Sequence, residues 1–185
     1  MVEMNVVGVA VEPNTNRPLV WLKDREQRIF LPITIGSFEA TAIHMALYDE
    51  EPSRPPTCEL LRSILDGMGV KVTRVLINAL KEDVFFAEVS LNADGKTIGV
   101  DSRPSDALAL ALRTGAPVFV EDRVIQEAGM PISSSIDIEV EGVEGGISDR
   151  LTALRAELRE AVAREQYEEA ASLRDEIQRL EHEIR

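Results

Sequence analysis

The chain has 185 residues and a hydrophobic content of 44%, enough for one folded core and a smaller appended segment. Its net charge of −13 excludes a broad basic surface for nucleic acid, so a polyanion would have to be held at a local arginine cluster or through a divalent cation. The single cysteine, Cys58, excludes an intrachain disulfide and a zinc site built from several cysteines.

The first third of the chain alternates in the manner of β-strands. Three short segments rich in Val and Ile are separated by turn-forming residues, and we expect strands over 4–12, 18–24 and 28–36. A helix is expected over 37–50, with Ser37 as its N-cap. Residues 51–56, "EPSRPP", predict a stiff connection because proline cannot continue a helix.

A second helix and a second set of strands follow. The helix is expected over 57–69 with Thr57 as its N-cap, and its apolar stripe consists of Leu60, Leu61, Ile64, Leu65 and Met68. The remaining elements are expected as strands over 70–80, 84–92 and 96–102, a helix over 103–113, a strand over 117–121 and a helix over 122–129.

Each set of three strands leads into a helix whose first turn carries an acid. Aligning Glu39 with Asp106 matches "EATAI" to "DALAL". Two explanations stay open: an internal duplication, or the general preference for acids at helix N-termini, where each stabilises by ~0.3–1 kcal/mol. With either one, the order of elements predicts an α+β domain over 1–140, with a largely antiparallel or mixed sheet and three to four packing helices.

The C-terminal segment has a different composition. Residues 141–148 read as a small, acidic, glycine-bearing linker, and 149–185 contain neither Gly nor Pro. Leucines and alanines there form two helical seams in different phases, which fits an antiparallel helical hairpin or a stutter in one long helix. We favour the hairpin and expect it to need a protein partner or a second copy of the chain.

Acidic residues stand at the starts of the expected helices. Asp101 and Asp106 flank Arg103, Glu39 opens the first helix, and Glu59 opens the second. Helix starts and arginine suit phosphate, and two or three carboxylates can hold Mg²⁺ to activate water. The simpler explanation from residue types is a helix cap, in which Asp101 or Ser102 accepts backbone N–H bonds and Arg103 pairs with an acid.

Two further residue types invite a catalytic interpretation. His44 lies among apolar residues of the first expected helix, and a packing role is the better interpretation. A cysteine near a helix start has a lowered pKa in some proteins. For Cys58, a buried structural thiol is the better prediction.

Three segments resemble the bifunctional nuclease family: "LPITIGSFEATAI", "RPPTCELL" and "VDSRPSDALALALRTGAPVFV". Their order is that of the family, and together they span roughly residues 1 to 135. The tail "AREQYEEAASLRDEIQRL" resembles the UVR motif, a helical hairpin that mediates protein–protein contact. The residues that match the family motifs are Gly36, Glu39, Ala40, Arg54, Pro55, Thr57, Asp101, Arg103, Pro104, Ser105, Asp106 and Arg113.

One position departs from the pattern of the family. The family commonly reads Thr-His-Asp where this chain has Thr57, Cys58 and Glu59. The Asp-to-Glu change keeps a carboxylate, whereas the His-to-Cys change removes a proton carrier that works at neutral pH. If the histidine is needed for hydrolysis, this chain is a weak nuclease, uses Cys58 in a different way, or is inactive.

The resemblance implies a nuclease that hydrolyses phosphodiester bonds of DNA, RNA or both. From the physical argument, restricted to motif residues, we expect the acids Asp101, Asp106, Glu39 and Glu59 to be catalytic. Asp101 and Asp106 would hold Mg²⁺ or another divalent cation. The residues expected to contact substrate are Arg103, Ser105, Arg54 and Thr57.

The alternative is a non-catalytic adaptor that presents the C-terminal hairpin to a protein partner. It is motivated by the acidic charge, the missing histidine and the two apolar seams. We also expect a homo-oligomer, because strand edges and helical seams both offer self-association surfaces. No run approaches ~20 apolar residues and the N-terminus lacks a basic signal-peptide region, so a cytoplasmic protein without a membrane span is expected.

Overall fold

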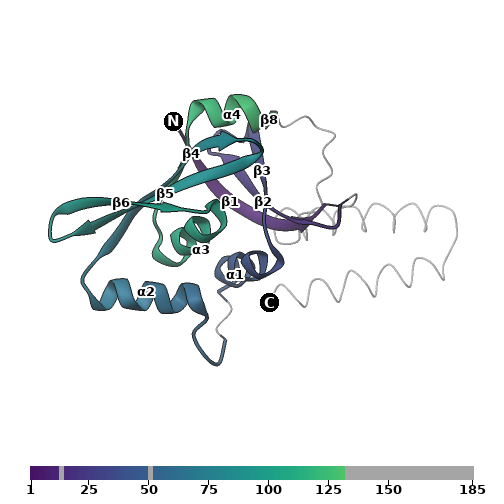
Figure 1. Ribbon diagram of the computed structural model, residues 1–185. Coiled ribbons are helices and arrows are strands. Elements are labelled where there is room, and N and C mark those ends of the chain that lie inside the picture. Colours follow the sequence, from purple (N-terminus) through teal and green to yellow (C-terminus); the bar gives the residue numbers. More distant parts are fainter. Residues whose placement is uncertain (13–14, 50–51, 132–185) are drawn as a thin grey trace, which may run out of the picture. The chain divides into compact units, whose positions relative to one another are not determined.

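The computed structural model describes residues 1–12, 15–49 and 52–131 (Figure 1). The strands of this part are β1 (Val2–Val11), β2 (Pro18–Asp24), β3 (Ile29–Thr34), β4 (Lys71–Lys81), β5 (Val84–Ala93), β6 (Lys96–Ser102), β7 (Val118–Val120) and β8 (Met130–Pro131). The helices are α1 (Ser37–Leu47), α2 (Thr57–Gly67), α3 (Pro104–Thr114) and α4 (Asp122–Ala128). The expected linker and hairpin at 141–185 lie outside the described residues.

The strands form one mixed sheet in the order β6-β5-β4-β7-β1-β2-β3-β8. Strands β1 to β3 form one antiparallel meander and β4 to β6 form another, and the short strand β7 lies between the two. It pairs antiparallel with β1 and parallel with β4, so these two strands run in opposite directions. β3 leads into α1 and β6 leads into α3, so an order of three strands followed by a helix occurs twice along the chain.

This architecture confirms the predicted α+β fold with a mixed sheet and four helices. The order of three strands followed by a helix also occurs twice, as the alignment of Glu39 with Asp106 assumes. The strand β8 was not predicted; its two residues pair with Ile29 and Phe30 of β3.

The predicted N-caps of the first two helices were wrong by one residue. Ser37 and Thr57 are the first helical residues, and the N-cap positions are the extended residues Gly36 and Pro56. Neither helix has a side-chain cap hydrogen bond. Pro56 lacks a side-chain acceptor, and Gly36 has no side chain. The preference of Ser and Thr for the N-cap position therefore does not determine where these two helices begin.

Rows of side chains that cross the sheet build its core. Val118 of β7 lies between Met4 of β1 and Val75 of β4, and Val75 is followed by Val89 of β5. All four side chains are buried. The helices α1 and α3 pack on each other, and α3 also packs on β4 and β5, so this face of the sheet is the helix-covered one.

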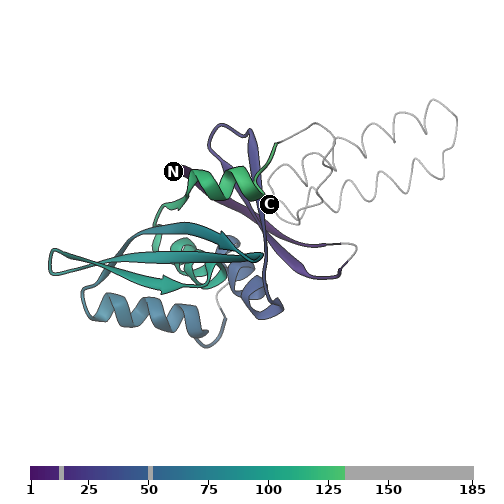
Figure 2. The same cartoon turned by 45° about the horizontal axis from the view of Figure 1, so that its top comes forward.

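The helices differ in how deeply they are buried. Figures 1 and 2 show α1, α2 and α3 gathered together, with α4 apart from them beside β3 and β4. Seven of the eleven residues of α3 are buried, whereas α2 has no buried residue. The start of α3 is fixed by Pro104 in its first turn, and its end by Gly115 in the left-handed conformation with φ of 68°.

None of the helices in the described ranges combines the length and the apolar character needed to cross a bilayer.

Candidate active site

Two of the predicted acids meet on one arginine, Arg103. Its Nη1 lies 2.9 Å from Oε1 of Glu39, and its Nε donates a hydrogen bond of 2.7 Å to Oδ2 of Asp106. Glu39 comes from the first turn of α1 and Asp106 from the first turn of α3. The two acids that the sequence alignment matched are therefore brought together in space; we call Arg103, Glu39 and Asp106 the Arg103 corner.

The Arg103 corner is open to solvent on the side of the guanidinium. The side chain of Arg103 is 67% exposed, that of Asp106 46%, and that of Glu39 only 20%. The hydrogen bond and charge of Asp106, and then those of Glu39, raise the pKa of Arg103 above its usual value. The corner thus holds an exposed, permanently charged cation between two carboxylates.

Gly36 gives the carboxylate of Glu39 its place. A Cβ atom at Gly36 would lie 2.2 Å from Oε2 of Glu39, far inside van der Waals contact. The backbone of Gly36 is ordinary extended chain, with φ of −80°. Glycine therefore leaves room for the carboxylate of Glu39 in its present place, and a larger residue would displace this acid.

The predicted helix cap at α3 is found only in part. Arg103 pairs with an acid as the cap interpretation expects, but α3 has no side-chain cap hydrogen bond. The hydroxyl of Ser102 instead donates to the carbonyl oxygen of Arg103. Asp101 lies on the edge strand β6, exposed and directly opposite Glu88 of β5, so the corner forms without it.

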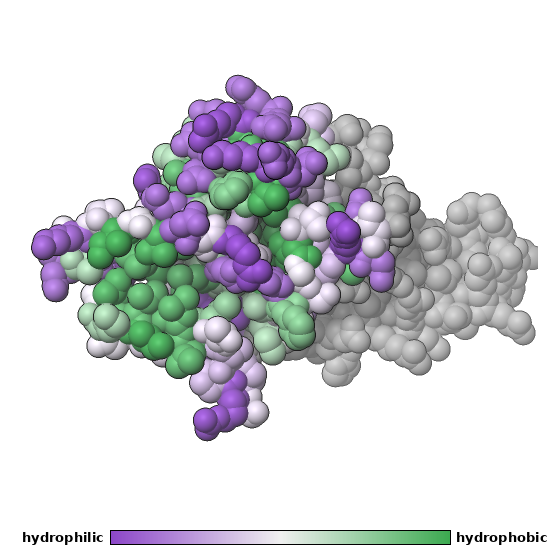
Figure 3. All heavy atoms as spheres, viewed as in Figure 1, coloured by the Kyte–Doolittle hydropathy of each residue, from purple (hydrophilic) through white to green (hydrophobic). Residues whose placement is uncertain are grey.

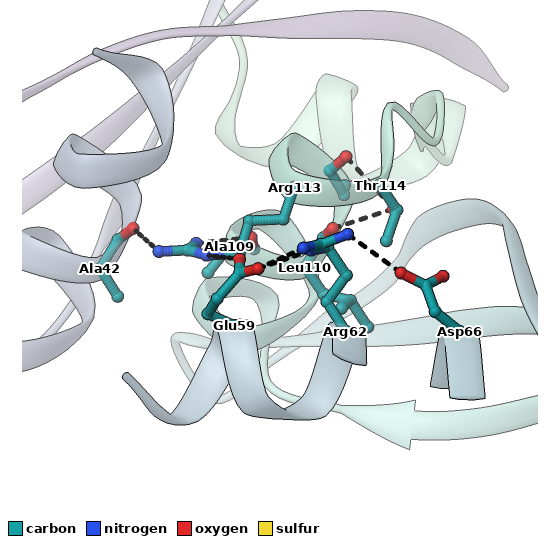
Figure 4. A network of polar contacts seen from close by, with 9 residues as sticks. Ala42, Glu59, Arg62, Asp66, Ala109, Leu110, Arg113 and Thr114 are labelled. Atoms are coloured by element: carbon teal, nitrogen blue, oxygen red, sulfur yellow. Dashed lines mark hydrogen bonds and ion pairs between the residues drawn. The ribbon is translucent and has the colours of Figure 1, made fainter. Parts of the chain in front are cut away.

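The fourth predicted acid, Glu59, belongs to a neighbouring network of arginines (Figure 4). It accepts hydrogen bonds from Nε of Arg62, at 2.8 Å, and from Nη2 of the same residue. Nε of Arg113 lies 3.7 Å from its other carboxylate oxygen. The hydrogen bond from Arg62 lowers the pKa of Glu59, so this acid is held ionised by two cations.

Arg113 joins the three helices. Its side chain is 8% exposed and donates to the carbonyl oxygens of Ala42 in α1, at 2.9 Å, and Ala109 in α3, at 2.8 Å. With Glu59 of α2 it touches all three helices, and we call Arg113, Glu59 and Arg62 the Arg113 joint. In the sequence, Arg113 was identified as a residue that matches the family motifs but was given no role; its place directly after the apolar residues 107–112 was a second available signal.

Cys58 lies between the Arg103 corner and the Arg113 joint. Burial raises the pKa of its thiol, Arg113 opposes this, and Asp106 and Glu39 add to it. The thiol is therefore protonated at neutral pH, and a lowered pKa is not observed. His44 packs on the ring of Tyr48, with centroids 4.5 Å apart.

The remaining predicted substrate contacts are placed separately. Arg54 is exposed in the connection before α2, Thr57 is exposed at the first position of that helix, and Ser105 is buried at 6% exposure. A groove of about 660 Å³ runs between this connection, α1, α2 and α3, and Glu59, Arg62 and Arg113 line it.

The arrangement of the carboxylates shows whether they could hold a metal ion. Within residues 1–12, 15–49 and 52–131, no three His, Cys, Asp or Glu side chains form a set that could hold a metal ion. The carboxylates of Glu39 and Asp106 bind the guanidinium of Arg103 instead. In this arrangement the donors do not form a ready-made site for a divalent cation.

Comparisons with known proteins find two family matches. The model of the bifunctional nuclease domain matches residues 20–133, and that of the UvrB/uvrC motif matches residues 148–183. The order of the two agrees with the resemblance in the sequence.

Several curated proteins are similar to this chain. An uncharacterized protein of Mycobacterium tuberculosis is 38% identical over 139 residues, which cover 75% of this chain and 83% of that protein. Bifunctional nuclease 2 of Arabidopsis thaliana is 25% identical over 167 residues, covering 80% of this chain and 51% of the plant protein. Bifunctional nuclease 2 of Oryza sativa subsp. japonica is 25% identical over 154 residues, covering 81% and 46%.

Proposed function

The chain belongs to the bifunctional nuclease domain family, and we propose that it is a nuclease that hydrolyses phosphodiester bonds of DNA, RNA or both. The observation that carries the proposal is the Arg103 corner, where an exposed guanidinium is held between two carboxylates at the starts of two helices. The names of the plant relatives, bifunctional nucleases, support the same activity.

The chemistry follows from the groups at the corner. The planar fork of Arg103 binds two phosphate oxygens and stabilises the negative charge that builds up on them during the reaction. As Arg103 turns to the phosphate, Glu39 or Asp106 is released to accept a proton from the attacking water. The water oxygen bonds to phosphorus, the bond from phosphorus to the leaving sugar oxygen breaks, and that oxygen takes a proton from solvent.

An exposed aromatic residue next to Glu39 in the chain favours a single-stranded substrate. Phe38 is 91% exposed and directly precedes Glu39 in α1. Unpaired bases stack on aromatic side chains, each worth ~1–3 kcal/mol, whereas paired bases keep their faces inside the duplex. We propose that Phe38 receives a base next to the phosphate on Arg103.

The direct test compares two arginine variants of the full chain on fluorescent single-stranded oligonucleotides. Arg103→Ala should lower hydrolysis by about a hundred-fold or more, because it removes the group that stabilises the transition-state charge. Arg25→Ala is the matched control: Arg25 is 69% exposed and pairs with Glu3 at 2.7 Å, so it too is an exposed, ion-paired arginine. Undiminished activity of Arg103→Ala would overturn the assignment and indicate a contaminating nuclease.

A glycine variant tests the positioning of Glu39 without removing a charge. Gly36→Ala should displace the Glu39 carboxylate and lower activity, while Gly67→Ala, where a Cβ meets no atom within 4 Å, should not. Equal activities of the two variants would show that the place of Glu39 in the corner does not matter.

Other parts of the predicted site remain predictions. Mg²⁺ or another divalent cation on Asp101 and Asp106 is tested by the same assay with EDTA and with Asp101→Asn. The contacts from Arg54, Thr57 and Ser105, and a catalytic role of Glu59, are tested by single substitutions scored for KM and kcat.

The alternative proposal is a non-catalytic adaptor. The match of residues 148–183 to the UvrB/uvrC motif favours it, as does Cys58 at the position where the family commonly has histidine. Deletion of 148–185 should then abolish capture of a protein partner. Retained capture would refute the adaptor, and hydrolysis that depends on Arg103 would decide for the nuclease.

A further inference from the structure

The edge strand β6 is open for pairing. It has seven residues, of which all but Ser102 are exposed, and within the described residues its ladder of hydrogen bonds is formed with β5 alone. The opposite edge of the sheet ends on β8, which has only two residues. A long edge strand with Ile98 and Val100 near its centre and no proline is a template for another strand.

The helix-covered face of the sheet continues onto this edge. The buried row of Val75 and Val89 ends at Val100, and the row of Val72 and Leu91 ends at Ile98. Val100 is 43% and Ile98 47% exposed, because β6 is the last strand. The apolar rows of the sheet are therefore unfinished at β6.

The helix α2 adds four exposed apolar side chains. Leu60, Leu61, Ile64 and Met68 are between 44% and 72% exposed. Figures 1 and 2 both place α2 alongside the β5–β6 end of the sheet, and Figure 3 shows a continuous hydrophobic area there. We call these four residues, with Ile98 and Val100, the apolar face.

We propose that the apolar face and β6 bind a second copy of this chain, with the two β6 strands pairing antiparallel about a two-fold axis normal to the sheet. Such an axis keeps the helix-covered faces of both copies on the same side of a continuous sheet. The unfinished rows then continue from one copy into the next, and one α2 lies on each side of the seam. An isolated strand from another protein would cover the edge and leave α2 exposed.

The symmetry of the proposed dimer follows from the two edges. We take β6 as the shared edge because it is the longer of the two end strands among the described residues, and an interface that uses the same edge of both copies closes into a dimer. Because alternate side chains point to opposite faces, only a residue-centred register keeps both rows on one face. The axis therefore passes through or beside one of the residues Ile98, Gly99 and Val100.

The area and the charge of the apolar face are consistent with binding a second copy of the chain. The six side chains of the apolar face, which are between 43% and 72% exposed, offer on the order of 500 Å² per copy, and two copies with their strand edges reach the lower range of specific interfaces. The chain carries a net charge of −13, yet these six side chains are uncharged. Lys96 and Asp101 lie at opposite ends of β6, so antiparallel pairing brings the Lys96 end of one copy to the Asp101 end of the other.

The test measures the oligomeric state of the full chain by sedimentation velocity. The wild type should be a dimer at micromolar concentration, and Val100→Lys should weaken the dimer by roughly thirty-fold or more, as for a central interface residue. Met68→Lys, at the most exposed position of the face, should weaken it without disturbing the fold. Val84→Lys is the matched control, because Val84 is 55% exposed on β5, outside the apolar face.

A crosslinking experiment places the seam. In a Cys58→Ser background, a flexible bismaleimide crosslinker should join two copies of Ile98→Cys, because position 98 lies within two residues of the axis in each of these registers, and it should not join two copies of Val84→Cys. A monomeric wild type, a dimer unaffected by Val100→Lys and Met68→Lys, or equal crosslinking through positions 84 and 98 would each overturn the proposal. None of these outcomes depends on nuclease activity, so the two proposals fail separately.

Discussion

The helices α2 and α3 have the same length and both carry several leucines, yet they are buried to different extents. Leu108 of α3 is completely buried, while Leu61 of α2 is 44% exposed. The helix α3 packs on α1, β4 and β5, and α2 packs mainly on α3. An apolar stripe thus shows which side of a helix avoids water, but not whether the same chain covers it.

The largest expected difference between these helices is in core packing. Leu108→Ala should lower the free energy of unfolding by about 2–5 kcal/mol, because it leaves a cavity in the core. Leu61→Ala should cost about 1 kcal/mol or less in the monomer. Urea unfolding in a Val100→Lys background, which removes the proposed dimer, measures both; equal losses would show that α2 is as integral to the core as α3.

The next effect concerns the Arg113 joint, by which α3 holds its neighbours. Arg113→Met keeps much of the side-chain bulk but removes the donors to the Ala42 and Ala109 carbonyls, at an expected cost of about 1–3 kcal/mol. Arg123→Met is the control, because Arg123 also donates to a backbone carbonyl, that of Asn78, but from an exposed position. Thermal unfolding of both variants should show the larger shift for Arg113→Met.

The two helix ends should respond to alanine with opposite signs. Gly115→Ala after α3 forces a left-handed residue and should destabilise by about 1 kcal/mol. At Gly67 in α2 an added Cβ has no atom within 4 Å. Gly67→Ala should therefore raise the free energy of unfolding by about 0.4–1 kcal/mol, because it lowers the entropy of the unfolded chain. Urea unfolding of the two variants measures both effects, and destabilisation of similar size at both positions would contradict the expected opposite signs.

The smallest effect is the pH dependence of the ion pair on α2. Arg62 lowers the pKa of Glu59 below its ordinary value of 4.5, so the pair stabilises the fold above that value and loses this contribution as the pH falls through the folded-state pKa. Both side chains are partly exposed, so the contribution is small. Arg62→Gln should unfold at a slightly lower temperature than the wild type at neutral pH, and the two curves should converge in acid; a constant gap would exclude the pair as its cause.

The sequence predicted the fold class, and two of the four acids expected at the site, Glu39 and Asp106, lie together in the structure. Alternation and turn residues gave the two meanders, and the alignment of Glu39 with Asp106 anticipated that these acids hold equivalent positions. It did not show that Arg103 lies between them, because this contact joins residues more than sixty positions apart. Asp101 and Glu59 are also acids near helix starts in the sequence, but the pairing of β6 with β5 places Asp101 opposite Glu88, and Glu59 binds Arg62.

Burial was the least predictable property. The stripe on α2 was correctly located, but periodicity carries no information on whether a second surface meets it. The space that Gly36 leaves for Glu39 was equally hidden, since a glycine before a helix usually indicates conformational freedom.

The position of β7 sets an order on folding. In the sheet, the meander of β1 to β3 and the meander of β4 to β6 are linked only through Val118–Val120, which come after both in the chain. During synthesis each meander can form by local contacts, but the sheet closes only when this late three-residue strand enters between two older ones. A chain that stops before Val118 would leave one edge of β1 and one edge of β4 unpaired, so this short segment completes the sheet, while the packing of α1 on α3 joins the same two halves through the helices.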